Sequence, residues 1–141
     1  MASNDEPDFL ETFRRRCSAY GLEPAWSTPD KLASKWSEMV SDLTDGGYAY
    51  TIFELDDQLH VRKIIEDLLQ DEVLKRSSSH GIFEHSILEA DRQLKAFFIP
   101  GFKRPNTQYW WEQGLLKEAG PQYVENAGVF YGVAVKNCEH G

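Results

Sequence analysis

Apolar residues recur along most of this chain at the three- and four-residue spacing of amphipathic helices. The pattern predicts a first helix over residues 6 to 20, because Gly21 is placed to end it. A second helix is predicted from Thr28 to Leu43, since Thr28 can cap free backbone amides and Pro29 suits the first helical position. The first third of the chain is therefore expected to be helical.

The middle of the chain contains an ambiguous segment followed by a clear helical pattern. YAYTIFEL, after the break at Gly46-Gly47, is rich in β-forming residues and fits either a short strand or the first turn of a helix. We favour a helix from about Thr51 that continues to Arg76, because a regular apolar stripe follows. Its members are Val61, Ile64, Ile65, Leu68 and Leu69.

The last third is predicted to contain one more long helix and an aromatic segment. The long helix starts near Phe83 and ends before Pro100, because proline disfavours helical geometry in the residue ahead of it. A short helix is predicted through QYWWEQGLLKEA, and VFYGVAV has the composition of a strand. Such a strand would need a partner, and YAYTIF is the candidate.

These patterns predict a mainly α fold, a compact bundle of about four amphipathic helices closed by an aromatic C-terminal segment. The alternative adds a short β-hairpin made by YAYTIF and VFYGVAV. With 141 residues and no shift in composition that marks a linker, residues 1 to 141 are expected to form a single domain.

Composition and cysteine usage favour a cytoplasmic globular protein. The chain is 41% hydrophobic and 13% aromatic, so its core is expected to be rich in rings. Cys17 and Cys138 form no disulfide framework, which favours a reducing compartment. The acidic N-terminus does not fit a secretory signal, and no apolar run approaches the length of a membrane span.

The net charge of −8 is concentrated in the N-terminal part of the chain. Residues 1 to 60 carry 12 acids and 5 bases, whereas residues 61 to 141 carry 11 acids and 10 bases. Such a field repels nucleic acid and attracts a basic protein. Solubility alone is the simpler reading of the same charge.

Motifs of familiar enzymes are absent: the chain has no glycine-rich phosphate loop, no GxSxG, no CxxC and no HExxH. Asp56, Asp57 and His60 share a helical face and could bind a divalent ion, but an acidic first turn that complements the helix dipole explains them better. We therefore expect no metal and no cofactor. Cys17, inside an apolar stripe, is expected to be inert packing.

The first candidate binding surface is the acidic stretch between residues 42 and 57. Carboxylates would steer a basic partner towards it, and tyrosines would anchor that partner. The alternative is a solvated hinge whose tyrosines cover the core. The residues assigned to this surface are Asp42, Asp45, Tyr48, Tyr50, Glu54, Asp56 and Asp57.

The second candidate surface is the aromatic stretch FFIPGFKRPNTQYWWEQG, where Lys103, Arg104 and Tyr109 stand near two tryptophans. Trp110 and Trp111 lie about 100° apart on a helix, so one ring should be buried and the other should lie at a boundary. We favour a lid over the core rather than a nucleic-acid site, with a mixed aromatic and basic rim for protein binding as the intermediate case.

These observations favour a non-enzymatic protein-binding role with a basic partner. In size, acidity and missing catalytic motifs the chain is similar to small acidic cytosolic inhibitors, including immunity proteins that neutralise basic toxins. One alternative is an accessory subunit held in a larger assembly by its aromatic C-terminal surface. Another is a metal-binding protein or enzyme that uses Asp56, Asp57 and His60.

Overall fold

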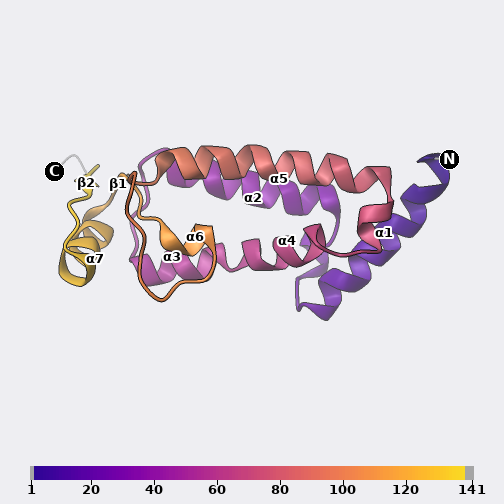
Figure 1. Cartoon of the computed structure of the whole chain (residues 1–141), viewed down its shortest axis with the longest axis horizontal. Helices are drawn as coiled ribbons and strands as arrows, with labels where there is room; N and C mark the ends of the chain where they lie inside the picture. Colours follow the sequence, from indigo (N-terminus) through magenta and orange to yellow (C-terminus); the bar gives the residue numbers. More distant parts are fainter. Residues whose placement is uncertain (1, 139–141) are drawn as a thin grey trace. The chain divides into compact units, whose positions relative to one another are not determined.

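The structure, a computed structural model, describes residues 2 to 138 and the burial of side chains from Asp8 onward. Helices dominate the element order, so the predicted mainly α class is confirmed (Figure 1). Within the described part of the chain, no helix is both long enough and apolar enough to cross a membrane.

The chain groups into two compact units, each built from two separate stretches of sequence. Unit 1 contains the chain up to Glu38 together with Val61–Ala90, and unit 2 contains Met39–His60 together with the chain from Asp91 onward. The single domain expected from the sequence stays a prediction.

Unit 1 is built from helices that pack through apolar side chains. Helix α1 contacts η1, α4 and η2, all within this unit. The bounds of its elements are α1 (Ala2–Ala19), η1 (Pro24–Trp26), α4 (Val61–Leu69), η2 (Leu74–Arg76), and the first parts of α2 (Pro29–Thr44) and α5 (Ser78–Phe97). The most deeply buried side chains are Phe13, Cys17, Leu32, Trp36, Ile65, Leu68, Leu74 and Ile87.

Threonine side chains cap the starts of two helices, and the sequence predicted the first of these caps. Thr28 Oγ1 accepts the amide of Lys31 at 3.3 Å, ahead of α2. Thr51 Oγ1 accepts the amide of Glu54 at 3.1 Å, and the Glu54 carboxylate accepts the amide of Thr51 in return. The preference for a helix from about Thr51 is confirmed, with α3 spanning Ile52–Leu59.

The single long helix predicted from Thr51 to Arg76 is wrong, because the structure has α3, then α4, then a separate turn. No glycine or proline marks the break at His60, which is where the chain passes from unit 2 to unit 1. Helix α4 ends at Leu69 because the Asp71 carboxylate accepts the amides of Val73 and Leu74, at 2.9 and 3.0 Å, and so starts a new turn.

Helix α5 begins earlier than the apolar pattern indicated. It starts at Ser78 rather than near Phe83, because Ser77 Oγ accepts the amide of Ser79 at 3.1 Å and so caps a polar first turn. The helix ends at Phe97, and the prediction that it stops before Pro100 is confirmed.

Beyond α5 the predicted short helix is present only as α6 (Trp110–Gln113). The residues after it run extended beside the end of α5, where Ile99 donates to the Leu115 carbonyl at 2.9 Å and Lys117 to that of Phe97 at 3.0 Å. These tertiary hydrogen bonds replace the helical ones that the pattern of QYWWEQGLLKEA predicted.

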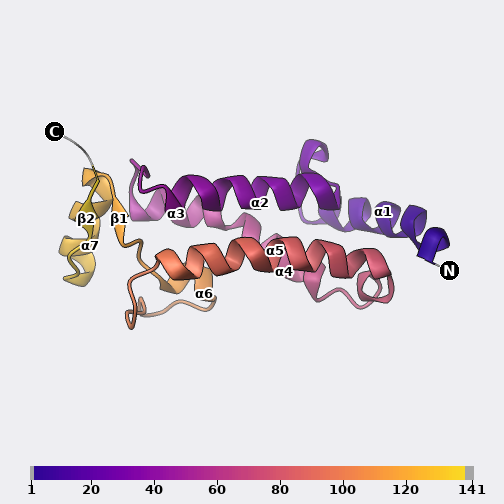
Figure 2. The same ribbon diagram turned by 90° about the horizontal axis from the view of Figure 1, so that it is seen from above.

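The strand considered in VFYGVAV as an alternative does not form, because Val129 lies within helix α7 (Pro121–Tyr131). Pro121 occupies the first position of that helix, and Gly132, with φ at 63°, ends it in the left-handed conformation. The sheet consists instead of β1 (Glu118–Ala119) paired in parallel with β2 (Lys136–Asn137), so no hairpin with YAYTIF forms. Both views show α7 beside this sheet (Figures 1 and 2).

Candidate functional site

All residues that the sequence assigned to a binding surface lie in unit 2. The acidic stretch covers the end of α2, the following loop and α3. Its exposed members are Asp42, Asp45, Tyr50, Glu54 and Asp57, whereas Tyr48 is buried and Asp56 is half-buried. The stretch therefore presents four carboxylates and one tyrosine ring to solvent.

A recess of about 430 Å³ opens within this stretch. Two exposed carboxylates, Asp42 and Asp45, line it, and its lining contains no lysine, arginine or histidine. Tyr50 lies at the recess with 53% of its surface exposed. The full lining is Met39, Asp42, Leu43, Asp45, Gly47, Tyr48, Ala49, Tyr50 and Gln58.

Tyr48 forms a fixed aromatic wall of the recess. Its hydroxyl donates to the Thr51 carbonyl at 2.8 Å, and its ring meets those of Tyr50 and Tyr123 edge to face, each at 5.8 Å. Burial raises the pKa of Tyr48 above its ordinary value, so the phenol stays protonated and keeps this hydrogen bond. Tyr50 is therefore held next to the recess by a rigid neighbour.

The loop that carries Tyr48 is fixed from the other side by Gly120. The Gly120 amide donates to the Tyr48 carbonyl at 2.6 Å. A Cβ atom on Gly120 would lie 3.0 Å from that carbonyl oxygen and 3.1 Å from Cα of Ala49. The approach is tight, so glycine suits this position, and the hydrogen bond links the loop to the start of α7.

The predicted acidic and aromatic surfaces are joined by one ion pair. The Arg104 guanidinium donates to both carboxylate oxygens of Asp56, at 2.7 and 3.0 Å, and also to Tyr131 Oη and the Glu112 carbonyl, each at 3.0 Å. The Arg104 side chain is 9% exposed. Burial alone would lower the pKa of Arg104, but the hydrogen bonds to Asp56 and Tyr131 raise it, so the group stays charged.

The two tryptophans of the aromatic stretch differ in burial, as the sequence predicted. Trp111 is 4% exposed and stacks on Tyr109 with ring centroids 4.6 Å apart. Trp110 is half-buried, meets Phe98 edge to face and has Lys95 Nζ 4.6 Å from its ring centroid. Most of this stretch therefore covers the core of unit 2, and Lys103 remains exposed beside it.

The residues considered for metal binding and nucleophilic chemistry are engaged in other ways. Asp56 pairs with Arg104, and among the described residues no group of His, Cys, Asp and Glu is arranged to hold a metal ion. Cys17 is fully buried, and burial raises the pKa of its thiol to about 11. Such a thiol is protonated at neutral pH and inaccessible to a substrate.

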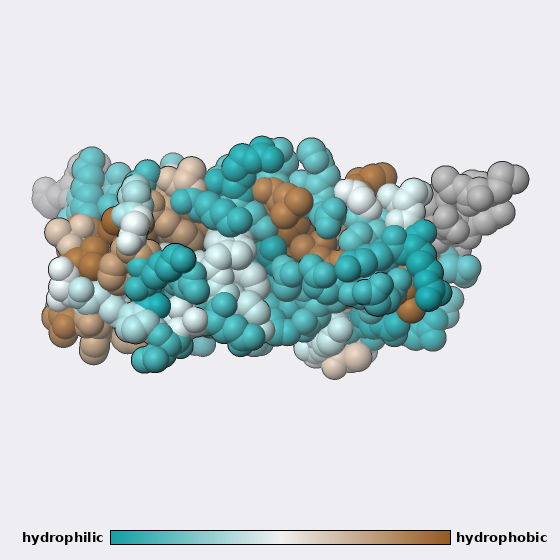
Figure 3. Space-filling model, viewed as in Figure 1, coloured by the Kyte–Doolittle hydropathy of each residue, from teal (hydrophilic) through white to brown (hydrophobic). Residues whose placement is uncertain are grey.

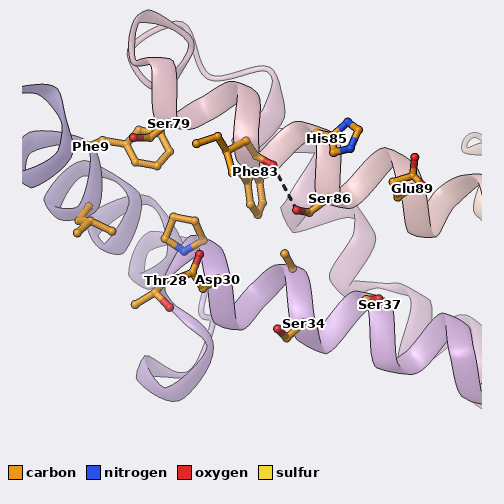
Figure 4. Close-up of a pocket in the computed structure, with 14 residues that line it drawn as sticks. Phe9, Thr28, Asp30, Ser34, Ser37, Ser79, Phe83, His85, Ser86 and Glu89 are labelled. Carbon is orange, nitrogen blue, oxygen red and sulfur yellow. Dashed lines mark hydrogen bonds between the residues drawn. The ribbon is translucent and has the colours of Figure 1, made fainter. Parts of the chain in front are cut away.

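Unit 1 contains a larger groove that the sequence analysis did not identify. It has a volume of about 720 Å³, and α1, α2 and α5 supply its walls. Figure 4 shows Phe83 pointing from α5 into the space that faces α2, with Phe9 from α1 at one end. Ile82, at 71% exposed, is the most exposed apolar side chain in its lining.

Serine and threonine hydroxyls line this groove together with Asp30, His85 and Glu89. The Ser86 hydroxyl donates to the Ile82 carbonyl at 3.3 Å, and Thr28 caps α2 (Figure 4). The sequence contained one indication of the groove. Ala33, Ser34 and Ser37 place small side chains on neighbouring positions of α2, which leaves space beside this part of the helix. That spacing alone does not identify a ligand.

Comparison of the chain with protein-family models, curated proteins and solved structures finds no match.

Proposed function

We propose that this chain is a non-enzymatic protein-binding protein, an inhibitor or immunity-type protein of the cytoplasm, whose acidic recess receives a basic side chain of its partner. The observation that carries the proposal is the recess itself, in which Asp42 and Asp45 stand beside the exposed ring of Tyr50 without a neighbouring base in the lining.

The chemistry of the recess suits a lysine or arginine side chain. The aliphatic stem would lie against the ring of Tyr50, and the charged end would reach the carboxylates of Asp42 and Asp45. A cation near a tyrosine face gains about 0.5 to 1 kcal/mol at an exposed site, so the ring adds to the ionic contacts. The net charge of −8 would accelerate the encounter with a basic protein and disfavour nucleic acid.

The test is capture of partners from the native host lysate by the immobilised chain, with proteins identified by mass. The informative variant is Asp42→Lys with Asp45→Lys. Its matched control is Glu72→Lys with Glu84→Lys, which changes the net charge equally at exposed positions of unit 1. We expect a basic protein to bind the wild-type chain and the control, to be lost from the recess variant, and to dissociate as salt is raised.

If the recess variant and the control both lose the basic partner equally, net charge alone explains the loss. If all three chains capture the partner equally, the recess is not its binding site. A salt-resistant partner would instead favour the accessory-subunit alternative, in which the aromatic stretch with Trp110 makes the contact.

A further inference from the structure

Three large apolar side chains of unit 2 are exposed on α3 and α7. Phe53 on α3 is 48% exposed, and Val129 and Phe130 on α7 are 70% and 56% exposed. Hydrophobic surface is visible over α7 in Figure 3. We call these three residues the apolar patch. Exposed apolar side chains that stand singly need no explanation, but a group drawn from two contacting helices does.

The patch is held in place by contacts between the two helices. The rings of Phe53 and Phe130 meet edge to face with centroids 5.4 Å apart. The Ile52 amide, at the start of α3, donates to Asn126 Oδ1 on α7 at 3.1 Å. Rings that are already ordered lose little conformational entropy when a partner covers them, which is the property of an interface anchor.

The charges around the patch restrict what can cover it. Helices α3 and α7 together contain four carboxylates, Glu54, Asp56, Asp57 and Glu125, and no lysine or arginine. Arg104 neutralises Asp56, and the other three are exposed. A second copy of this chain would bring the same acids against these, and an acidic membrane surface would be repelled. A partner with apolar side chains flanked by lysine or arginine would complement both the exposed apolar side chains of the patch and the carboxylates around them.

We infer that the apolar patch binds the apolar face of a basic amphipathic helix that belongs to the partner. Such a helix offers apolar side chains at three- and four-residue spacing with cations beside them, which matches three anchors bordered by carboxylates. The inference rests on the proposed function, because it specifies which part of the basic partner binds. Tyr50, at the recess, precedes Phe53 by three residues, so the recess and the patch are close along the chain.

The test uses two fluorescent probe peptides of the same leucine and lysine composition, each of about 18 residues, long enough to form a helix when bound. One peptide places its leucines on a single helical face, and in the other the order is scrambled so that no such face exists. Affinities are measured by fluorescence anisotropy. The patch variant is Val129→Ser with Phe130→Ser, and the matched control is Ile82→Ser with Leu88→Ser, which removes two exposed apolar side chains from α5.

We expect the wild-type chain and the control to bind the amphipathic peptide at least about tenfold more tightly than the scrambled one, as removal of a few anchors commonly costs that much affinity. The patch variant should bind both peptides alike. A preference that survives in the patch variant, or that is absent from the wild-type chain, overturns the inference. So does a wild-type dimer in sedimentation that the patch variant converts to monomer, because the occupant is then a second copy.

The recess variant, Asp42→Lys with Asp45→Lys, separates this inference from the proposed function. Weaker binding of both peptides with the preference retained supports both proposals. Unchanged binding of both peptides with the preference retained overturns the recess alone and leaves the patch supported.

Discussion

Unit 1 and unit 2 are stabilised by different kinds of interaction. In unit 1 the backbone is paired within long helices, and fully buried side chains such as Leu32, Trp36 and Leu68 fill the space between them. Unit 2 has short elements joined by irregular chain, so many of its backbone groups need partners from side chains. Arg104 and Tyr123 supply them, to the Glu112 carbonyl and the Leu116 amide. Where regular structure is short, polar side chains stabilise the fold.

The hollows of the two units differ in the same way. The groove of unit 1 is larger, about 720 Å³ against about 430 Å³, and its lining combines serine and threonine hydroxyls with Asp30, His85 and Glu89. The recess of unit 2 combines unbalanced carboxylates with an exposed tyrosine. A lining without a basic side chain and the exposed ring of Tyr50, rather than volume, therefore distinguish the candidate site.

The largest effect is expected from breaking the ion pair of unit 2. Asp56→Asn leaves the buried Arg104 guanidinium without its counter-ion, which we expect to lower the free energy of unfolding by about 3 to 5 kcal/mol. Urea denaturation measures this loss. The control is Asp57→Asn, one residue away and exposed, which should change stability by less than about 0.5 kcal/mol.

A double variant tests whether the lost stability comes from leaving the charge of Arg104 unpaired. Asp56→Asn with Arg104→Met removes both charges, so it should recover part of the stability lost in the single variant. If Asp56→Asn costs less than about 1 kcal/mol, the pair behaves as a surface salt bridge and the contrast between the units fails.

Unit 1 should respond most strongly to loss of apolar volume. Leu68→Ala removes a fully buried side chain from α4 and is expected to cost about 2 to 5 kcal/mol, measured as a lower melting temperature and a lower urea midpoint. Ile64, on the same helix, is only half-buried, so Ile64→Ala should cost less. Equal losses would show that the apolar stripe is not oriented as the structure has it.

A smaller effect is expected from a single hydroxyl in unit 2. Tyr123→Phe removes the group that accepts the buried Leu116 amide at 2.8 Å, and an unpaired buried amide costs about 1 to 3 kcal/mol. Tyr50→Phe is the matched control, because Tyr50 is exposed and should tolerate the change. If both variants match the wild-type chain in urea denaturation, side-chain pairing does not stabilise unit 2 in the way proposed.

Local sequence was sufficient for the features that depend on neighbouring residues. Thr28 caps a helix as predicted, a helix begins just after Thr51, and Pro100 lies beyond the end of α5. The break at His60 and the early end of α4 could not be predicted from the apolar stripe, because a stripe continues whether or not the helix does. VFYGVAV was a possible strand because of its β-forming residues, but its first three residues are the last of helix α7, which begins at Pro121 and ends before Gly132.

The candidate site, too, could be predicted from the sequence only where it depends on neighbouring residues. The acidic stretch and the burial of one tryptophan followed from local composition and helical geometry. The pairing of Arg104 with Asp56 did not, because 48 positions separate the two residues and nothing in either segment specifies the other. Nor did the apolar patch, which requires knowing that α3 and α7 are helices in contact, with Phe53 and Phe130 on adjoining faces.

The smallest expected effect tests whether unit 1 also depends on a charge. Burial alone would raise the pKa of Asp71, but hydrogen bonds from Arg16 and from the amides of Leu74 and Val73 hold it below its ordinary value. A carboxyl whose folded pKa is depressed contributes stability above its unfolded pKa, about 3.9, and loses it as pH falls through the folded value. Arg16→Met should therefore shift the acid-induced fall of the urea midpoint to higher pH. Arg15→Met, whose pair with Glu11 is well exposed, should leave the profile unchanged. If the profiles of wild type and Arg16→Met superimpose, the Arg16–Asp71 pair does not stabilise unit 1. Unit 1 would then depend on apolar packing alone at this contact, in stronger contrast to unit 2.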